Sequence, residues 1–198
     1  MPRLRTANLL GALAGEVSER LDRLLTHPNQ TDTSAAALAL MSCYEGLSNA
    51  ELAAGLGLSH PATVRLADKL EAAGFVETRP GRDRRAVALH LTDAGRARAR
   101  QILADRCVVV AEVTDALDTA EQDQLAALLE KMLRSITGDM ASAVHICRLC
   151  DETVCPEATC PVHQAALAPA RSSPTAASSS PRSPTRSTPQ SRINSPPC

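Results

Sequence analysis

Aromatic side chains are almost absent from this 198-residue chain, which has one Tyr, one Phe and no Trp. Its core must be built from Ala, Leu and Val, which suits close-packed helices better than β-sandwiches. The scarcity also disfavours binding of single-stranded nucleic acid, which usually needs aromatic stacking platforms. The longest apolar stretch, residues 34–41, is far shorter than the ~20 residues that cross a bilayer. We therefore expect a mainly helical protein that is not a membrane protein.

Net charge is also nearly absent, because 21 Lys and Arg offset 22 Asp and Glu. The total by itself predicts no charged partner. Along the chain, however, the charges are segregated. Residues 78–100 contain seven Arg and two Asp (+7 − 2 = +5), and residues 112–157 contain three basic and ten acidic residues (3 − 10 = −7). This segregation predicts one basic face and one acidic region that points away from a polyanion.

The motifs that indicate an enzyme are missing as well. The sequence has no Gly-rich phosphate loop, no nucleophile elbow and no His-Glu-x-x-His metal helix. Its Asp and Glu residues occupy positions typical of helix surfaces. We expect a binding protein and no enzyme.

The N-terminus superficially resembles a signal peptide, because Arg3 and Arg5 precede a short apolar stretch. Apolar residues nevertheless keep a helical period as far as Leu24, with charged residues between them. An amphipathic helix in a cytoplasmic protein explains this pattern better. In that compartment, cysteines are more often ligands, redox sensors or core residues than parts of a disulfide framework.

Capping and turn signals divide the chain into six helices and one β-hairpin. Ser48 with Glu51 and Thr119 with Gln122 form capping boxes, and Pro80-Gly81 marks the hairpin turn. We expect helices over about residues 6–25, 33–44, 48–55, 59–73, 92–117 and 119–136, and strands over 75–78 and 87–91. This order predicts a mainly α fold of the α+β winged-helix type, with a two-stranded β-wing.

Two short helices joined by a Gly-containing turn and followed by a basic hairpin are the parts of a winged helix-turn-helix. Leu66 and Leu70 fall on one face of the second helix, and Arg65 and Lys69 recur on the opposite face. Small residues let the start of this helix enter a major groove, where Arg65 is suited to a guanine edge. The free N–H groups at this helix end suit a phosphate oxygen.

The hairpin carries several arginines around Asp83, which is suited to orient one arginine while another reaches the minor groove or the DNA backbone. A solvated charged turn is the simpler alternative, but the preceding helix pair favours a DNA-binding wing. We expect contacts to double-stranded DNA from Ser59, His60, Pro61, Ala62, Thr63, Arg65, Lys69, Arg79, Arg82, Arg84 and Arg85.

Residues 47–52 (Leu-Ser-Asn-Ala-Glu-Leu) and 58–76, ending in Leu-Glu-Ala-Ala-Gly-Phe-Val, resemble the MarR family of bacterial transcription regulators. So do residues 83–95, in which an Asp-Arg-Arg wing leads into Leu-Thr-x-x-Gly. The resemblance covers about residues 9–136. It implies a winged-helix homodimer that binds a pseudo-palindromic operator, usually as a repressor released by a small ligand, a metal or an oxidant. It places the recognition helix at residues 60–73 and the wing contacts at Arg82, Arg84 and Arg85.

A homodimer also has a physical motive, because the long first, fifth and sixth helices carry apolar stripes outside the DNA-binding unit. Two-fold symmetry places two recognition helices about 34–36 Å apart, one turn of DNA. The alternative is that these helices fold back within one monomer. The segments that we expect are dimerisation and scaffold helices (1–47), a DNA-binding domain (48–95), C-terminal dimerisation helices (96–146), a cysteine-rich segment (147–163) and a disordered Ser/Pro-rich tail (164–198).

The cysteine-rich segment has the spacing Cys147-x2-Cys150-x4-Cys155-x4-Cys160, with His163 following. The MarR family does not normally contain such an extension. Four thiolates, or three thiolates and an imidazole, suit tetrahedral zinc, and four thiolates also suit an iron–sulfur cluster. A reversible dithiol–disulfide switch and unliganded thiols are compatible with the same pattern. Two other cysteines, Cys43 and Cys107, lie in helical apolar patterns, where we expect buried core residues.

Two functions therefore remain open. The first is a transcription regulator that needs its recognition-helix and wing arginines. The second is a metal-binding protein-interaction module that uses the winged-helix dimer as a platform without specific DNA binding. Under the second, Arg65 and the arginines of residues 82–85 would be dispensable.

Overall fold

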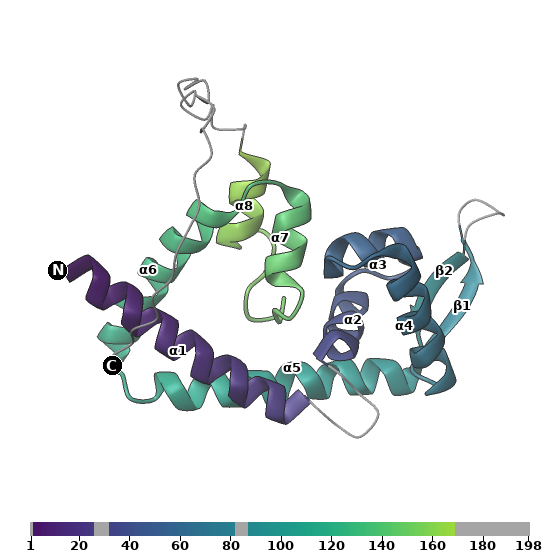
Figure 1. Ribbon diagram of the computed structural model, residues 1–198, viewed down its shortest axis with the longest axis horizontal. Helices are drawn as coiled ribbons and strands as arrows, with labels where there is room; N and C mark the ends of the chain where they lie inside the picture. The colour runs from purple at the N-terminus through teal and green to yellow at the C-terminus, as the bar shows by residue number, and fades with distance from the viewer. Residues whose placement is uncertain (1, 26–31, 82–86, 169–198) are drawn as a thin grey trace, which may run out of the picture.

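The computed structural model describes residues 2–25, 32–81 and 87–168. Within these ranges the chain forms eight helices and one two-stranded antiparallel sheet (Figure 1). This arrangement confirms the mainly α winged-helix class, with two more helices than expected. The elements, in chain order, are α1 (Pro2–Leu25), α2 (Asp32–Cys43), α3 (Asn49–Leu56), α4 (His60–Ala72), β1 (Val76–Pro80), β2 (Val87–Leu91), α5 (Asp93–Thr114), α6 (Thr119–Ile136), α7 (Met140–Cys147) and α8 (Pro161–Leu167).

The core surrounds α2, whose residues 34–41 are all buried. These residues form the apolar stretch that stands out in the sequence, and α3, α5 and β2 pack around them. Fully buried Leu38, Leu52, Leu89 and Ile102 come from four different elements. Small alanines on α2 let its neighbours approach closely, which is how a chain with two aromatic residues fills its core.

The start of α3 has the predicted capping box. The Ser48 Oγ accepts a hydrogen bond from the Glu51 N–H at 3.2 Å, and the Glu51 Oε2 accepts one from the Ser48 N–H at 2.8 Å. At the other end, Gly57 adopts a left-handed conformation with φ of 66° and ends the helix. Local chemistry at both ends therefore sets the length of α3.

A Ser48→Ala variant tests this cap. Losing the side-chain acceptor removes the hydrogen bond from the Glu51 N–H to Ser48 and is expected to lower the free energy of unfolding by about 1 kcal/mol. Urea unfolding at a fixed protein concentration measures the change, with Ser48→Thr as the control that keeps the hydroxyl. Equal stability of the alanine and wild-type chains would contradict the role of the cap.

The wing is an antiparallel pair in which Val76 lies opposite Leu91 and Pro80 lies opposite Val87. The second strand agrees with its predicted bounds, whereas the first begins one residue later and ends two residues later than predicted. A third segment joins the sheet, since the Leu89 N–H donates to the Leu47 carbonyl at 2.8 Å. A single residue between two helices has no periodicity, so the sequence pattern did not predict this bridge.

The long helix α5 connects the winged-helix unit to the arm that carries α6, and α1 packs along α5 (Figure 1). The α6 cap corrects the prediction by one residue. Asp118 is the N-cap and Glu121 the reciprocal partner, where Thr119 and Gln122 were expected. Both positions satisfy the motif, and the structure uses the pair of carboxylates, which also interact favourably with the helix dipole.

The two helices missing from the prediction follow α6. Asp139 caps α7 through the Ser142 N–H at 2.8 Å, and Pro161 occupies the first turn of α8. Because α8 extends to Leu167, residues 164–167 are helical and the expected disordered tail cannot begin at Gln164. The rest of that tail, residues 169–198, lies outside the described residues. Helices of seven and eight residues are too short for apolar periodicity to reveal.

None of the helices in the described ranges combines the length and the hydropathy that a membrane span requires.

Candidate functional site

Helix α4 presents one buried and one exposed face. Leu66, Ala67 and Leu70 are buried against the core. Arg65 and Lys69 are exposed on the other side, as the helical spacing predicts. The cationic side chains that could face a polyanion therefore leave the body of the protein on a helix that the core holds in place.

The residues at the start of α4 divide into two groups. His60 and Pro61 are exposed and Ala62 is half-buried. Thr63, however, is fully buried, and its hydroxyl donates to the Ser59 carbonyl at 3.2 Å. In the described structure its side chain is therefore not available for the predicted DNA contact. Ser59 is the N-cap residue, but its side chain makes no capping hydrogen bond, so it starts the helix by backbone conformation alone.

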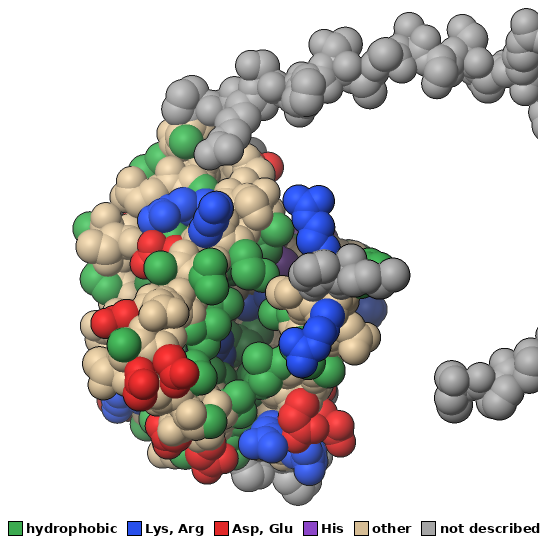
Figure 2. Space-filling view, turned by 90° about the vertical axis from the view of Figure 1, so that its left-hand side faces the viewer, with side chains coloured by type: hydrophobic (Ala, Val, Ile, Leu, Met, Phe, Trp, Pro, Cys, Tyr) green, Lys and Arg blue, Asp and Glu red, His purple; other side chains and the backbone are tan. Residues whose placement is uncertain are grey.

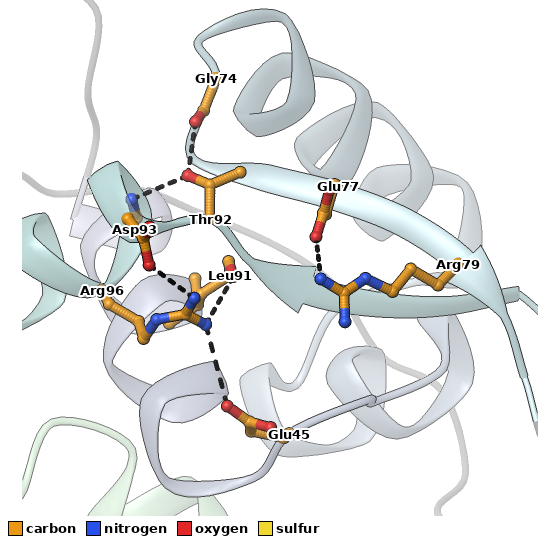
Figure 3. Close-up of polar contacts among 9 residues, drawn as sticks. Glu45, Gly74, Glu77, Arg79, Leu91, Thr92, Asp93 and Arg96 are labelled. Carbon is orange, nitrogen blue, oxygen red and sulfur yellow. Dashed lines mark hydrogen bonds and ion pairs between the residues drawn. The ribbon is translucent and has the colours of Figure 1, made fainter.

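The wing lies only partly in the described chain. Arg79, on β1, is exposed and pairs with Glu77 (Figure 3). Its charge is therefore partly neutralised by a neighbour two residues away on the same face of the strand. The other predicted wing residues, Arg82, Asp83, Arg84 and Arg85, lie outside the described residues.

The base of the wing is attached to the start of α5 by hydrogen bonds (Figure 3). The Thr92 hydroxyl donates to the Gly74 carbonyl at 2.7 Å and accepts from the Gly95 N–H at 3.0 Å. The Thr92 N–H donates to the Phe75 carbonyl at 3.0 Å. Thr92 therefore caps α5 and also joins it to the turn after α4, which explains the Leu-Thr-x-x-Gly motif.

Arg96 extends this attachment to α2. Its guanidinium donates to the Leu91 carbonyl and to Asp93 Oδ1, both at 2.8 Å, and its Nη1 lies 3.9 Å from Glu45 Oε1 (Figure 3). The hydrogen bond to Asp93 and its negative charge raise the pKa of Arg96. Arg96 belongs to the basic segment 78–100, yet it joins the end of β2 to the first turn of α5 and lies near Glu45 in the turn after α2. The positive charge available to a partner is thus smaller than the composition predicts.

The second set of candidate residues is the four-cysteine cluster, comprising Cys147, Cys150, Cys155 and Cys160. All four line one small cavity of about 40 Å³, together with His163. The Cys147 and Cys160 Sγ atoms are 3.9 Å apart, and all four thiols are free. Residues from the end of α7, the following turns and the start of α8 are thus brought together as the spacing predicted.

The thiols also influence each other's protonation. The hydrogen bond with Cys147 lowers the pKa of Cys150 to about 6, with help from the positive charges of Arg106 and Arg148. The same interaction, together with burial, raises the pKa of Cys147. Burial raises the pKa of Cys155 to about 11. The interaction between Cys147 and Cys150 therefore favours the thiolate form of Cys150 over that of Cys147.

The remaining candidates differ in their surroundings. The Nδ1 atom of His163 lies 3.1 Å from Glu157 Oε1. This nitrogen therefore already has an acidic partner and would have to leave it to bind a metal in the cavity. Cys43 is half-buried, and burial raises its pKa to about 11. Cys107 is exposed on α5, which corrects the expectation of a buried core residue. An apolar stretch of sequence shows that a helix has an apolar face, but it does not show that another part of the same chain packs against that face.

No group of three or more His, Cys, Asp or Glu side chains within residues 2–25, 32–81 and 87–168 stands in an arrangement that holds a metal ion. The cysteines therefore lie near one another without the closed geometry of a ligand set. The zinc and iron–sulfur predictions remain predictions.

Helix α7 places this segment against the helix-turn-helix. A Cβ atom built on Gly55 in α3 would lie 3.1 Å from Val144 Cγ1, and one on Gly57 would lie 3.5 Å from the His145 ring. Tyr44, at the end of α2, lines the same cavity as the cysteines. The sequence motifs showed both units but contained no signal that they touch.

Comparison with known proteins agrees with this geometry. Residues 31–86 match the model of the MarR family. The chain is 30% identical over 124 residues to the transcriptional repressor MprA of Escherichia coli strain K12, covering 61% of this chain and 70% of that protein.

Solved structures show the same likeness. Apo wild-type MarR from E. coli is 30% identical, with a TM-score of 0.52, over 63% of this chain and 96% of that one. A MarR family protein from Bacillus stearothermophilus is 24% identical, with a TM-score of 0.61, over 68% and 94%. This chain belongs to the MarR family of winged-helix transcription regulators.

Proposed function

We propose that this chain is a homodimeric repressor that binds a pseudo-palindromic operator in double-stranded DNA. The observation that carries the proposal is α4, whose apolar face is buried in the winged-helix core while Arg65 and Lys69 are exposed. A helix held in this way is able to enter a major groove without rearranging the core. The 30% identity to a transcriptional repressor supports repression as the mode of regulation.

Within α4, the two exposed cations have different roles. Arg65 lies one turn from the helix start, where its planar guanidinium reaches base edges and pairs bidentately with guanine. Lys69 lies one turn further along and suits a phosphate as a point charge. Ser59, His60 and Pro61 surround the helix start, where N–H groups without intrahelical partners attract a phosphate oxygen.

Unburied apolar stripes on α1 and α6 support the homodimer. None of the residues of α6 is buried in the described chain, and Leu128 is 60% and Ile136 66% exposed. On α1, Leu4 is 73% exposed. Figure 2 shows hydrophobic side chains gathered in a hollow on the side of the molecule that carries these helices. A second copy of the chain buries such stripes and pairs two recognition helices.

A small apolar effector is the release signal that the cavities favour. A cavity of about 270 Å³ lies between the end of α2, α3 and α7. Its walls include Leu40, Leu47 and Val144, and Glu51 supplies an acidic group at the start of α3. A ligand in this cavity contacts the helix that supports α4, so its binding would shift the recognition helix.

Replacing Arg65 by alanine tests the DNA-binding proposal. An operator is first selected from a random duplex library with the wild-type chain, and affinity is then measured by fluorescence anisotropy. Arg65→Ala is expected to weaken binding at least about tenfold, roughly 1.4 kcal/mol, and to relax the base preference at one position of each half-site.

The matched control is Lys131→Ala, which removes an exposed positive charge from α6 and should leave affinity within about twofold. Lys69→Ala should remove about one phosphate contact. The slope of the logarithm of the binding constant against the logarithm of the salt concentration should fall by about one, and the base preference should not change. If no operator can be selected, or if Arg65→Ala binds as the wild type does, the protein-interaction alternative replaces the regulator.

A further inference from the structure

We propose that the four-cysteine cluster binds one Zn²⁺ ion through four thiolates and that this ion fixes the α7–α8 extension against α3. The second clause rests on the proposed function, because it predicts an effect on operator binding. The proposal follows from sulfur geometry, from the size of the cavity and from the small core of the extension.

One sulfur–sulfur distance fits a single ion. With Zn–S distances of about 2.3 Å, the sulfur atoms of a tetrahedral site lie about 3.8 Å apart. The Cys147 and Cys160 Sγ atoms are 3.9 Å apart. Four-iron clusters attach each thiolate to a different iron atom, which keeps the sulfurs further apart, whereas a two-iron cluster places two thiolates on one iron and is separated from zinc by its iron content. A disulfide would bring the sulfurs to about 2.05 Å.

The backbone brings the other two cysteines to the same place. The Cys150 N–H donates to the Cys147 carbonyl at 2.8 Å, and the Cys155 N–H donates to the Asp151 carbonyl at 2.9 Å. Both cysteines therefore lie on tight turns that face the cavity of about 40 Å³. That volume accommodates a water-sized group. Rotation of cysteine χ1 angles between staggered positions is the movement that would close the four sulfurs around an ion.

The α7–α8 extension has few apolar contacts of its own to hold it together. Its own core contains three buried residues, Ala143, Cys160 and Val162, with Leu133 and Ile146 packed beside them. Its other apolar side chains pack outward, with Val144 and Leu149 against the main core and α8 against α6, so a bound metal would be the main link within the extension itself. Four thiolates around Zn²⁺ leave a net charge of −2; Arg106 and Arg148 act on Cys150 as positive charges, while Glu152 and Glu157 line the same cavity as negative ones.

The extension is positioned to affect DNA binding. Val144 lies against Gly55 and His145 lies near Gly57, so α7 touches the body and the end of α3. Helix α3 in turn packs against α4. Loss of the ion loosens α7 and removes one of the supports that set the orientation of the helix pair.

Metal content of the full-length chain is the test. The chain is purified anaerobically under reducing conditions and is expected to contain about one zinc per subunit by elemental analysis. Replacing zinc by Co²⁺ should produce the visible d–d bands of a tetrahedral thiolate site. Cys155→Ser and Cys160→Ser should lose the ion at least tenfold more readily to a competing chelator, whereas Cys107→Ser and His163→Ala should retain it.

Chelator treatment of the wild-type chain separates metal loss from misfolding of a variant. The stripped chain is expected to bind the selected operator about tenfold more weakly, and added Zn²⁺ should restore affinity. No stoichiometric metal, iron with sulfide and a brown colour, or a mass loss from disulfide formation would each overturn the zinc site. Zinc binding without any effect on operator affinity would overturn the coupling to α3. Failure of both metal-loaded and stripped chains to bind DNA would instead overturn the proposed function and leave the zinc site in place.

Discussion

A Leu128→Asp/Ile136→Asp double variant is expected to be monomeric and to lose at least about 100-fold of its affinity for a full operator, because each recognition helix then binds its half-site alone. Both side chains are largely exposed in the single chain, so aspartate costs the monomer little. In a dimer the same positions bury charge against the partner, which is strongly unfavourable.

Sedimentation and DNA titration measure the two effects. The matched control is Ala127→Asp, which places the same acid on α6 but on the opposite side of the helix from the leucine stripe. The control should remain dimeric with unchanged affinity. A double variant that stays dimeric would show that α6 is not in the interface.

A Gly95→Ala variant is expected to lower the free energy of unfolding by about 3 kcal/mol. A Cβ atom at this position would lie 1.9 Å from the Phe75 carbonyl oxygen and 3.2 Å from Leu91 Cδ2. Backbone cannot move aside as a flexible side chain does, so the first turn of α5 must separate from the base of the wing. That separation also strains the hydrogen bonds of Thr92, and operator affinity should fall with stability.

Urea unfolding at a fixed protein concentration gives the measurement, and Gly11→Ala is the control. Gly11 lies within α1, and no neighbouring atom of the described residues would lie within 4 Å of a Cβ added there. Alanine at this position should stabilise the chain by up to about 1 kcal/mol through helix propensity. The two substitutions are chemically identical, so opposite signs isolate the contact with Phe75. A Gly95→Ala chain as stable as the Gly11→Ala chain would contradict the close approach.

Most of the winged helix was predictable because its signals are local. Ser48, Glu51 and Gly57 act on backbone groups within a few residues of themselves, as Thr92 does where it caps α5, and such chemistry is present in any stretch of sequence that contains it. The bond from Thr92 to the Gly74 carbonyl, 18 residues away, has no such local signal. Where two caps competed, at Asp118 and Thr119, sequence alone left a choice between neighbours. The short α7 and α8 were missed because neither is long enough to show an apolar period.

The candidate sites depended more on the surroundings of each residue. Thr63 has a polar side chain at the start of the recognition helix, yet the core buries it. Arg79 and Arg96 belong to the basic segment, yet each faces a carboxylate. A count of charged residues treats every arginine as able to bind a partner. The tertiary structure shows which arginines already face a carboxylate within the chain.

The sequence by itself determined the family, the capping box of α3, the two-stranded wing and the gathering of four cysteines within fourteen residues, because these features rest on bonded neighbours and short spacings. Only the tertiary structure decided that α7 lies against α3, that Leu47 joins the wing and that Gly95 lies against the Phe75 carbonyl. The physical reason is that such contacts join residues far apart in the chain, and close packing of the whole core selects them. The cysteine cluster thus becomes a candidate regulator of DNA binding only through a contact that no local pattern encodes.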